Sequence, residues 1–336
     1  MLLNKNVCYL LRIVHCVLCI LFFSCSNPKT EEKQNPTSDI RHRTLTTPSF
    51  NPDSAYQYIK EQVAFGPRIP GTKAHENCSR YLSQKLKSFG LDVIVQNGVV
   101  ETYDKRKYNL SNIIAQYNTQ KPKRIFLCGH WDTRPFADRD SMNPTKPFDG
   151  ANDGGSCTAV LLEIARQLSV SKLGLGIDII LFDLEDYGDQ SGKTKNSWCL
   201  GSQYWAQHFH KPGYYAQYGI LLDMVGGRNA VFPREGSSIM YAPSIVNKVW
   251  DIAKQKGYGQ YFIDAEAPQT TDDHVYINQL ANIPTIDIVH YDIAKSDYMP
   301  CHHRHCDNLE NIDPFTLKMV GQVVLEVIFT EANQTQ

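Results

Sequence analysis

The feature that most constrains the fold is the segment Ile179–Tyr187, an apolar run that ends abruptly in acid. Its apolar residues are spaced as in a strand that is buried on both faces, in the middle of a parallel sheet. Glu185 and Asp186 stand side by side where this strand should end. Because ligand crevices in open α/β sheets lie at the carboxyl ends of strands, the two carboxylates could serve one site. Taken alone, the pair is better explained as a solvated acidic loop.

The rest of the chain continues this pattern of strands and helices. Apolar runs predict strands at 91–96, 109–116, 124–128, 177–184, 218–222 and 284–290. Apolar residues at helical spacing predict helices at 75–88, 156–169, 245–256 and 313–330. Strands alternating with helices predict an α/β fold, here a single-domain α/β/α sandwich whose mixed, mostly parallel central sheet is flanked by helices.

Length and charge limit the function classes. The 336 residues allow one large domain or two ordinary ones, and 34 basic residues balance 35 acidic ones. This balance gives no electrostatic case for binding nucleic acid or an anionic membrane surface. The 11 histidines and scattered aspartates are compatible with a metal enzyme.

The N-terminus has the pattern of an export signal. An apolar stretch at 13–23, preceded by Lys5 and Arg12, is too short to span a bilayer and fits a secretory signal. The following Ser24-Cys25 resembles a bacterial lipobox, so we expect residues 1–25 to be a leader and Cys25 to carry a lipid. An ordinary cleaved signal or an uncleaved anchor is the alternative. We therefore expect an exported, periplasmic lipoprotein anchored to a membrane.

Composition then separates a tether from a domain. Residues 26–52 are polar and rich in Pro, Thr, Glu and Lys, which is typical of a flexible tether, and 53–336 form the expected catalytic domain. Six of the ten cysteines lie beyond the leader, and none forms a CxxC pair, which argues against a zinc ribbon. Export would permit disulfides, but the pairing stays open. Cys128 and Cys157 have apolar neighbours and are expected in the core.

Polar residues recur just after the predicted strands. Four strand ends carry carboxylates or imidazoles, and a further aspartate lies between glycine-rich turns at a helix start. These residues are His130, Asp132, Asp153, Glu185, Asp186, Asp223 and His303. Solvation explains one such residue easily but not this many. Mixed Asp, Glu and His ligands without thiolate suit a catalytic zinc, which usually keeps three protein ligands and one open position.

In this order, the motifs resemble the zinc aminopeptidase superfamily, and within it the zinc-dependent, animal-like glutaminyl cyclases and their bacterial relatives. The resemblance covers about residues 53–330. The segments that carry it are Gly66-Pro67-Arg68, Pro70-Gly71-Thr72, His75, His130-x-Asp132, Asn152-Asp153, Glu185-Asp186, Ser197-Trp198, Asp223, Thr271-Asp272-Asp273-His274 and His303 with Asp307-Asn308-x-Glu310-Asn311-Ile312-Asp313.

The resemblance implies a role for each matching residue. One zinc per chain would be held by Asp153, Asp186 and His303. Glu185 would be the general acid and base, and Asp272 with Asp223 would form a carboxylate network that handles the leaving amine.

The chain also departs from the animal members. They have a second Glu where this chain has Asp186, and Trp where it has His302, so that wall of the substrate pocket must differ. Trp198 lies farther from Glu185 in sequence than its animal counterpart, after an apparent insertion, and is either a substrate contact or a structural aromatic. His130 and Asp132 would lie outside the zinc ligands or belong to a second metal site.

The expected function is therefore cyclisation of N-terminal Gln in peptides and proteins to pyroglutamate, with release of ammonia, by a monomer. The main alternative is a dizinc aminopeptidase that releases N-terminal residues. Its second metal would be bound by His130 and Asp223, with Asp153 bridging. From another class, an inactive peptide-binding lipoprotein would be expected to lack an acid or a ligand, and none is missing.

Overall fold

The chain from Thr44 onward forms one compact unit. A computed structural model describes residues 44–335. The predicted leader at 1–25, the lipid site at Cys25 and most of the tether at 26–52 lie outside the described residues. Within 44–335, no helix is both long enough and apolar enough to cross a bilayer.

This unit is built on a six-stranded sheet with the order β1-β2-β4-β3-β5-β8. The strands β4, β3, β5 and β8 are parallel, and β1 and β2 form an antiparallel hairpin at one edge. This is the mixed, mostly parallel sheet that the sequence predicts. The strands are β1 (Asp92–Glu101), β2 (Lys107–Tyr117), β3 (Arg124–His130), β4 (Gly176–Phe182), β5 (Gly219–Asp223) and β8 (Thr285–Val289).

The predicted central strand is confirmed as β4, which lies between β2 and β3. Every residue of β4 is buried. Ile179 and Leu181 belong to the core on one face of the sheet, and Ile180 and Phe182 to the core on the other. Side chains alternate between the faces of a strand, so burial on both faces requires the continuous apolar run found here.

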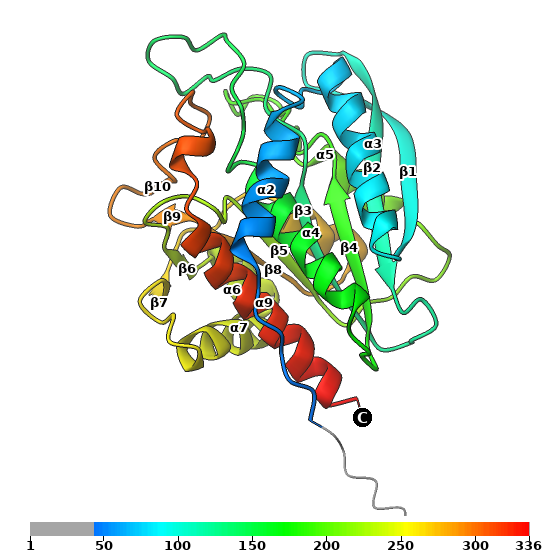
Figure 1. The fold of residues 1–336 in the computed structure, drawn as a ribbon. Helices are drawn as coiled ribbons and strands as arrows, with labels where there is room; N and C mark the ends of the chain where they lie inside the picture. The colour runs from blue at the N-terminus through cyan, green and yellow to red at the C-terminus, as the bar shows by residue number, and fades with distance from the viewer. Residues whose placement is uncertain (1–43, 336) are drawn as a thin grey trace, which may run out of the picture. The chain divides into compact units, whose positions relative to one another are not determined.

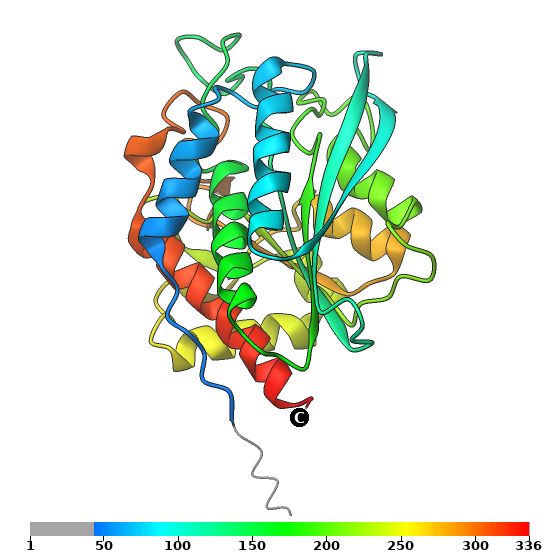
Figure 2. The same cartoon turned by 45° about the vertical axis from the view of Figure 1, so that its right-hand side comes forward.

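Helices cover both faces of the sheet (Figures 1 and 2). The larger core lies under α2, α3, α4, α7 and α9, and the smaller core under α5 and the π-helical turn η1. The helices are α2 (Pro52–Val63), α3 (Lys73–Ser88), α4 (Gly155–Ser169), α5 (Leu200–Gln207), α6 (Gly236–Tyr241), α7 (Pro243–Gln255), α8 (Asp273–Tyr276), η1 (Ile277–Ala281), the 3-10 turn η2 (Leu309–Asn311) and α9 (Pro314–Asn333).

The packed part of the chain begins before the predicted boundary at residue 53. The Phe50 side chain is buried against α9, where a Cβ on Gly321 would lie 2.2 Å from its ring. The Phe50 amide donates to Gln322 Oε1 at 2.9 Å, and the Leu45 amide to Asn333 Oδ1 at 2.7 Å. Residues 44–51, which the sequence assigns to the tether, are thus fixed along α9 because that helix offers a gap for one aromatic ring.

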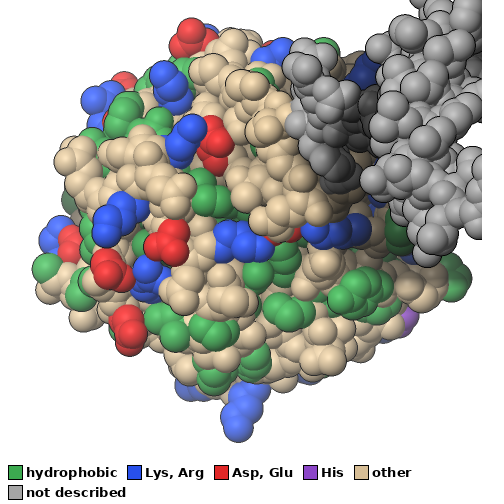
Figure 3. Space-filling view, turned by 90° about the horizontal axis from the view of Figure 1, so that it is seen from below, with side chains coloured by type: hydrophobic (Ala, Val, Ile, Leu, Met, Phe, Trp, Pro, Cys, Tyr) green, Lys and Arg blue, Asp and Glu red, His purple; other side chains and the backbone are tan. Residues whose placement is uncertain are grey.

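Several small elements were not predicted because they are too short for a periodic signal. They are the strand pair β6 (Phe232–Arg234) with β7 (Phe262–Glu266), the pair β9 (Tyr291–Asp292) with β10 (Asp297–Tyr298), and α6. On the face shown in Figure 3, Lys and Arg side chains are interspersed with Asp and Glu. That face therefore carries no patch of a single sign.

Candidate active site

A cavity of about 520 Å³ contains most of the predicted site residues. Its walls include Glu185, Asp223, Asp272, Asp153, Asp186, His303, Trp198 and His302. The remaining two candidates, His130 and Asp132, are buried and do not line it. The sheet topology explains the grouping, because parallel strands bring their carboxyl ends to the same edge.

The turn after β4 fixes the two adjacent carboxylates. Leu184 has a φ of 54°, so the chain turns sharply directly after the strand. The buried Asp132 carboxylate accepts the amide of Glu185 at 3.1 Å and that of Asp186 at 3.3 Å. On the strand side, Asp183 accepts from the Ser111 amide at 2.8 Å and lies 2.7 Å from His75 Nε2. Asp132 therefore orients both candidates through their backbone.

Asp153 is held at the start of α4. Gly154 has a φ of 74°, and a Cβ there would lie 2.7 Å from the Asp132 carbonyl oxygen, so only glycine fits. The buried Asp307 carboxylate accepts the Asn152 amide at 2.7 Å and the Asp153 amide at 3.1 Å. A residue about 150 positions away thus sets the backbone of Asp153.

The side chains of Asp153, Asp186 and His303 converge in the cavity. His303 Nε2 lies 2.9 Å from Asp186 Oδ1 and 3.7 Å from Asp153 Oδ2. Within residues 44–335, Asp153 Oδ2 is buried and accepts no hydrogen bond. Burial opposes ionisation of Asp153, but His130 and His303 hold its pKa below the ordinary value. Two carboxylates and an imidazole around an unsatisfied oxygen fit a divalent metal such as zinc.

The tautomers distinguish the two neighbouring histidines. His302 Nδ1 lies 2.7 Å from Arg139 Nη1, and a guanidinium can only donate, so His302 Nδ1 must accept and the ring carries its proton on Nε2. His303 Nδ1 instead lies 3.4 Å from the Asp138 carboxylate, which leaves its Nε2 lone pair for a metal. His302 is suited to donate a hydrogen bond into the cavity, and His303 to bind a metal.

Glu185 and Asp272 form a carboxylate pair beside this donor set. Their oxygens lie within 4.8 Å of one another, and the Cys199 thiol donates to Glu185 Oε1 at 3.2 Å. Burial raises the pKa of Glu185 well above its ordinary value. Burial and the charge of Asp223 raise the pKa of Asp272 to about 7, and burial raises that of Asp223 to about 6. The cluster can therefore hold a proton near neutral pH, as an acid–base catalyst must.

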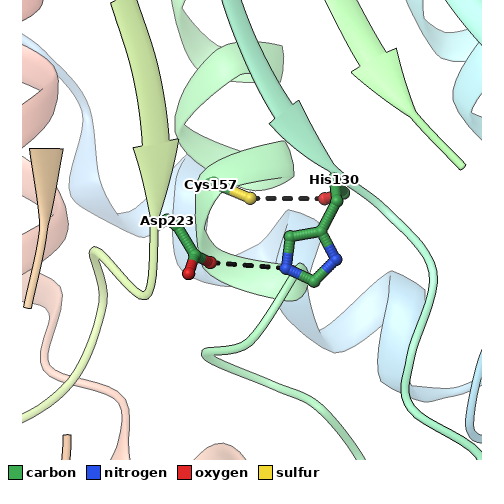
Figure 4. Close-up of side chains that lie close together, drawn as sticks. All are labelled: His130, Cys157 and Asp223. Atoms are coloured by element: carbon green, nitrogen blue, oxygen red, sulfur yellow. Dashed lines mark hydrogen bonds and ion pairs between the residues drawn. The ribbon is translucent and has the colours of Figure 1, made fainter. Parts of the chain in front are cut away.

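His130 lies between the carboxylates of Asp153 and Asp223. Its Nε2 lies 3.0 Å from Asp153 Oδ1 and 3.3 Å from Asp223 Oδ1, the contact drawn in Figure 4. Its Nδ1 lies 3.5 Å from Asp132. The Cys157 thiol donates to the His130 carbonyl oxygen at 3.3 Å, and burial raises the thiol pKa, so Cys157 is the core residue that the sequence predicts. The triplet of His130, Asp153 and Asp223 has the composition of a second metal site or of a hydrogen-bonded support.

Trp198 forms part of the cavity wall and also packs against site residues. Its ring is nearly parallel to that of His303, with centroids 6.1 Å apart, and the Arg134 guanidinium lies 4.7 Å from its centroid. Gly188 lies so close beneath it that a Cβ would be 1.9 Å from Trp198 Cδ2. Trp198 is therefore both a structural aromatic and an available substrate contact.

The sequence interpretation missed residues that support the site. Arg134 donates from its backbone to Asp186 Oδ2 at 3.1 Å and from Nε to Asp138 Oδ2 at 3.0 Å. The only sequence signal was their place in the polar loop after Asp132. The cysteine pairing left open is also visible here, since Cys301 and Cys306 form a disulfide on either side of His302 and His303.

Comparisons with known proteins agree with this fold. A solved glutaminyl cyclase from Bacteroides thetaiotaomicron is 49% identical and covers 84% of this chain and 99% of that one, with a TM-score of 0.82. A solved Zn-dependent exopeptidase from Parabacteroides distasonis is also 49% identical, covers 84% of this chain and 99% of that one, and has a TM-score of 0.83.

An aminopeptidase of Bacillus subtilis is 26% identical over 66% of this chain, and the match spans only 44% of that protein's length. The model of peptidase family M28 matches residues 112–328, which hold β3, β4, β5, β8 and every residue of the candidate site. The chain belongs to peptidase family M28.

Proposed function

We propose that the protein is a zinc-dependent glutaminyl-peptide cyclotransferase, which converts N-terminal Gln of peptides and proteins to pyroglutamate and releases ammonia. One observation carries the proposal. The cavity that holds Asp153, Asp186 and His303 also holds Glu185 and Asp272, whose carboxylate oxygens lie within 4.8 Å of each other. The solved bacterial glutaminyl cyclases that are 44–49% identical to this chain support the same activity.

The cavity would bind the Gln residue with its side chain folded back on its own amine. Asp153, Asp186 and His303 would hold one zinc, which when bound supplies Lewis-acid chemistry at the γ-carbonyl. Trp198 and His302 line the cavity, and His302 can donate from Nε2 to a substrate oxygen. Because nucleophile and electrophile belong to one residue, correct positioning alone lowers much of the barrier.

Glu185 would move the proton. Its side chain is 12% exposed in the cavity wall, so it can reach the substrate while remaining largely shielded from water. As the α-nitrogen forms its bond to the γ-carbon, Glu185 accepts a proton from that nitrogen. It then returns the proton to the γ-amide nitrogen, the carbon–nitrogen bond breaks, and ammonia leaves. Asp272, near Glu185, would share this proton during the transfer.

A paired assay tests the proposal. Purified protein is incubated with Gln-Ala and with Ala-Ala, ammonia and free amino acids are measured in parallel, and zinc is counted per chain. A cyclase releases ammonia from Gln-Ala without free Ala and carries about one zinc. Free Ala from either dipeptide would contradict cyclisation as the main reaction.

A dizinc aminopeptidase is the second candidate, favoured by one observation. His130 Nε2 lies within 3.3 Å of both Asp153 and Asp223, so these residues could hold a second metal, and Glu185 could then activate water. The exopeptidase from Parabacteroides distasonis is as similar as the cyclases. In the same assay this candidate predicts free Ala and about two zinc ions per chain.

We also propose that the protein is exported and anchored in the periplasm through a lipid on Cys25. The leader pattern at 1–25 supports this location. The Cys301–Cys306 disulfide supports it too, because disulfides persist in oxidising compartments. Replacing Cys25 by Ser should move the protein from the membrane fraction to the soluble fraction of the cell. Unchanged membrane retention would contradict the anchor.

A further inference from the structure

The loop that carries His303 is closed by a disulfide. Cys301 and Cys306 are joined across a Cα–Cα distance of 5.3 Å, and the ring they close contains His302 and His303. One end of the ring is tied to the sheet, because Cys301 packs on the apolar cluster formed by Met224, Val289 and Met299. The ring thus connects a ligand-bearing loop to the edge of the sheet.

The other end of the ring leads directly to the support of Asp153. Asp307 follows Cys306 and accepts the amides of Asn152 and Asp153. The disulfide therefore joins the part of the loop fixed on the sheet to the part that holds Asp153. Two of the three proposed ligands, His303 and Asp153, depend on the position of this one ring.

His303 needs such a restraint because of its backbone. Its φ is 54°, in the left-handed region that side-chain-bearing residues seldom adopt. His303 itself has modest ties: the Arg139 amide donates to its carbonyl at 3.2 Å, and its Nδ1 lies 3.4 Å from Asp138. Its neighbours are held by the Arg304 amide, which donates to the Cys301 carbonyl at 3.0 Å, and the His305 amide, which donates to Asp140 at 3.2 Å. An open loop would be free to relax out of this conformation and move Nε2 away from Asp186.

We infer that the Cys301–Cys306 disulfide positions the metal-binding histidine, so that its reduction speeds the loss of zinc while the fold persists. The inference rests on the proposed zinc site. Reduction by a phosphine is balanced: the S–S bond breaks, each sulfur takes a proton from water, and the phosphine becomes its oxide. The effect should match that of losing another residue that orients a metal ligand, about 10–100-fold.

Zinc release from the full chain to a coloured chelator tests this inference. The proteins compared are the native protein, the phosphine-treated native protein and the double variant Cys301→Ser, Cys306→Ser. The matched control is Arg304→Ala, which changes an exposed side chain inside the same ring. Release should be about 10–100-fold faster in the treated protein and in the double variant, and unchanged in the control. Phosphine should have no further effect on the double variant, which excludes chelation by the reductant.

Two readouts separate positioning from general stability. With cobalt in place of zinc, the visible spectrum should change on reduction, because the histidine ligand moves. The Tm of the metal-free protein should change little. Release rates within twofold of native, an unchanged cobalt spectrum, or an equal Tm loss with and without metal would overturn the inference. If the double variant does not fold, the zinc release and cobalt spectrum of the phosphine-treated native protein test the inference instead.

The same experiment keeps the two proposals apart. Ammonia release from Gln-Ala by the native zinc protein tests the cyclase alone. A protein that hydrolyses Ala-Ala yet loses zinc on reduction would refute the cyclase and retain the positioning role. A protein that releases ammonia from Gln-Ala but whose zinc release is unchanged by reduction would support the cyclase and refute the positioning role.

Discussion

Glu185 combines the properties that proton transfer requires. It lies in the cavity wall, its backbone is fixed by Asp132, and burial raises its pKa well above the ordinary value. Burial favours the protonated form of such a carboxylate, which can therefore hold a proton and return it. The neighbouring Asp186 carboxylate lies instead 2.9 Å from His303 Nε2, so the two adjacent carboxylates face different groups.

We expect Glu185→Gln to lower turnover by about 10²–10⁴-fold, the usual contribution of general acid–base catalysis, because an amide cannot carry the proton. Zinc content should not change, since Glu185 is not among the proposed ligands. Ammonia release from Gln-Ala and zinc counting check both points. Glu185→Asp, which keeps a shorter carboxylate, should fall between native and Gln. Turnover of the Gln variant close to native would show that another group moves the proton.

Asp272 should make the metal-free protein less stable as the pH rises. Its pKa is raised from 3.8 to about 7, first by burial and then by Asp223. The folded protein therefore binds this proton more tightly than the unfolded chain does. This contribution is complete below pH 3.8 and is lost as the pH rises to about 7.

The Asn side chain of the Asp272→Asn variant cannot ionise, so this variant should not lose that stability as the pH rises. Its Tm relative to native protein, measured with a chelator present, should rise between about pH 4 and pH 7 and then level off. Turnover should fall about 10²-fold or more while zinc binding persists. A Tm difference that is constant with pH would show that Asp272 titrates normally, and loss of zinc would mark it as a metal-site residue.

At the scale of elements, the site is made by turns at strand and helix ends. The turn after β4 presents Glu185 and Asp186, the turn before α4 presents Asp153, and the loop after β10 presents His303. The first two turns are fixed by the buried carboxylates of Asp132 and Asp307, and in the third His303 Nδ1 lies 3.4 Å from the half-buried Asp138. The turns that carry Glu185, Asp186 and Asp153 stay rigid because Asp132 and Asp307 are buried and hydrogen-bonded to them.

Gly188 is where this packing can be disturbed without touching a proposed ligand. Gly188→Ala would drive a methyl group into Trp198, since a Cβ there lies 1.9 Å from the indole. We expect the ring to shift and KM for Gln peptides to rise about tenfold, the loss of roughly one aromatic contact. Gly259→Ala is the control, because its nearest neighbour lies at 3.5 Å. Steady-state kinetics with zinc counting would measure this, and an unchanged KM would make Trp198 purely structural.

At the scale of the whole molecule, bound zinc should hold together segments that are far apart in the sequence. Asp153 and Asp186 come from the sheet side and His303 from a loop more than a hundred residues later in the chain. Without a cation, the charge of Asp153 opposes ionisation of the nearby Asp186 carboxyl.

Removing zinc with a chelator should therefore lower the Tm. At free zinc 1,000-fold above Kd, binding adds about 4 kcal/mol, which corresponds to a shift on the order of 10 °C for a domain of this size. Calorimetry with and without chelator measures it, and added zinc should restore the Tm. A Tm that does not respond to chelator would mean that the three residues hold no metal important to the fold.

The sequence alone determined the features that depend on short-range spacing. The continuous apolar run of β4 requires burial on both faces, and the acids after it must lie at the sheet edge. The predicted helix at 313–330 likewise begins where α9 does, and Asp313 accepts the Phe315 amide as its N-cap. These features could be predicted because neighbours in sequence fix them.

Only the tertiary structure decided which distant groups support one another. Asp307 holds the amide of Asp153 across 154 positions, and Asp138 faces His303, yet neither pair leaves a periodic signal. The Cys301–Cys306 pairing and the tautomers of His302 and His303 were equally hidden. Spacing reports the direction in which a side chain leaves its own strand or helix. Whether it finds a partner depends on the packing of the whole chain, which brings those elements within hydrogen-bond distance.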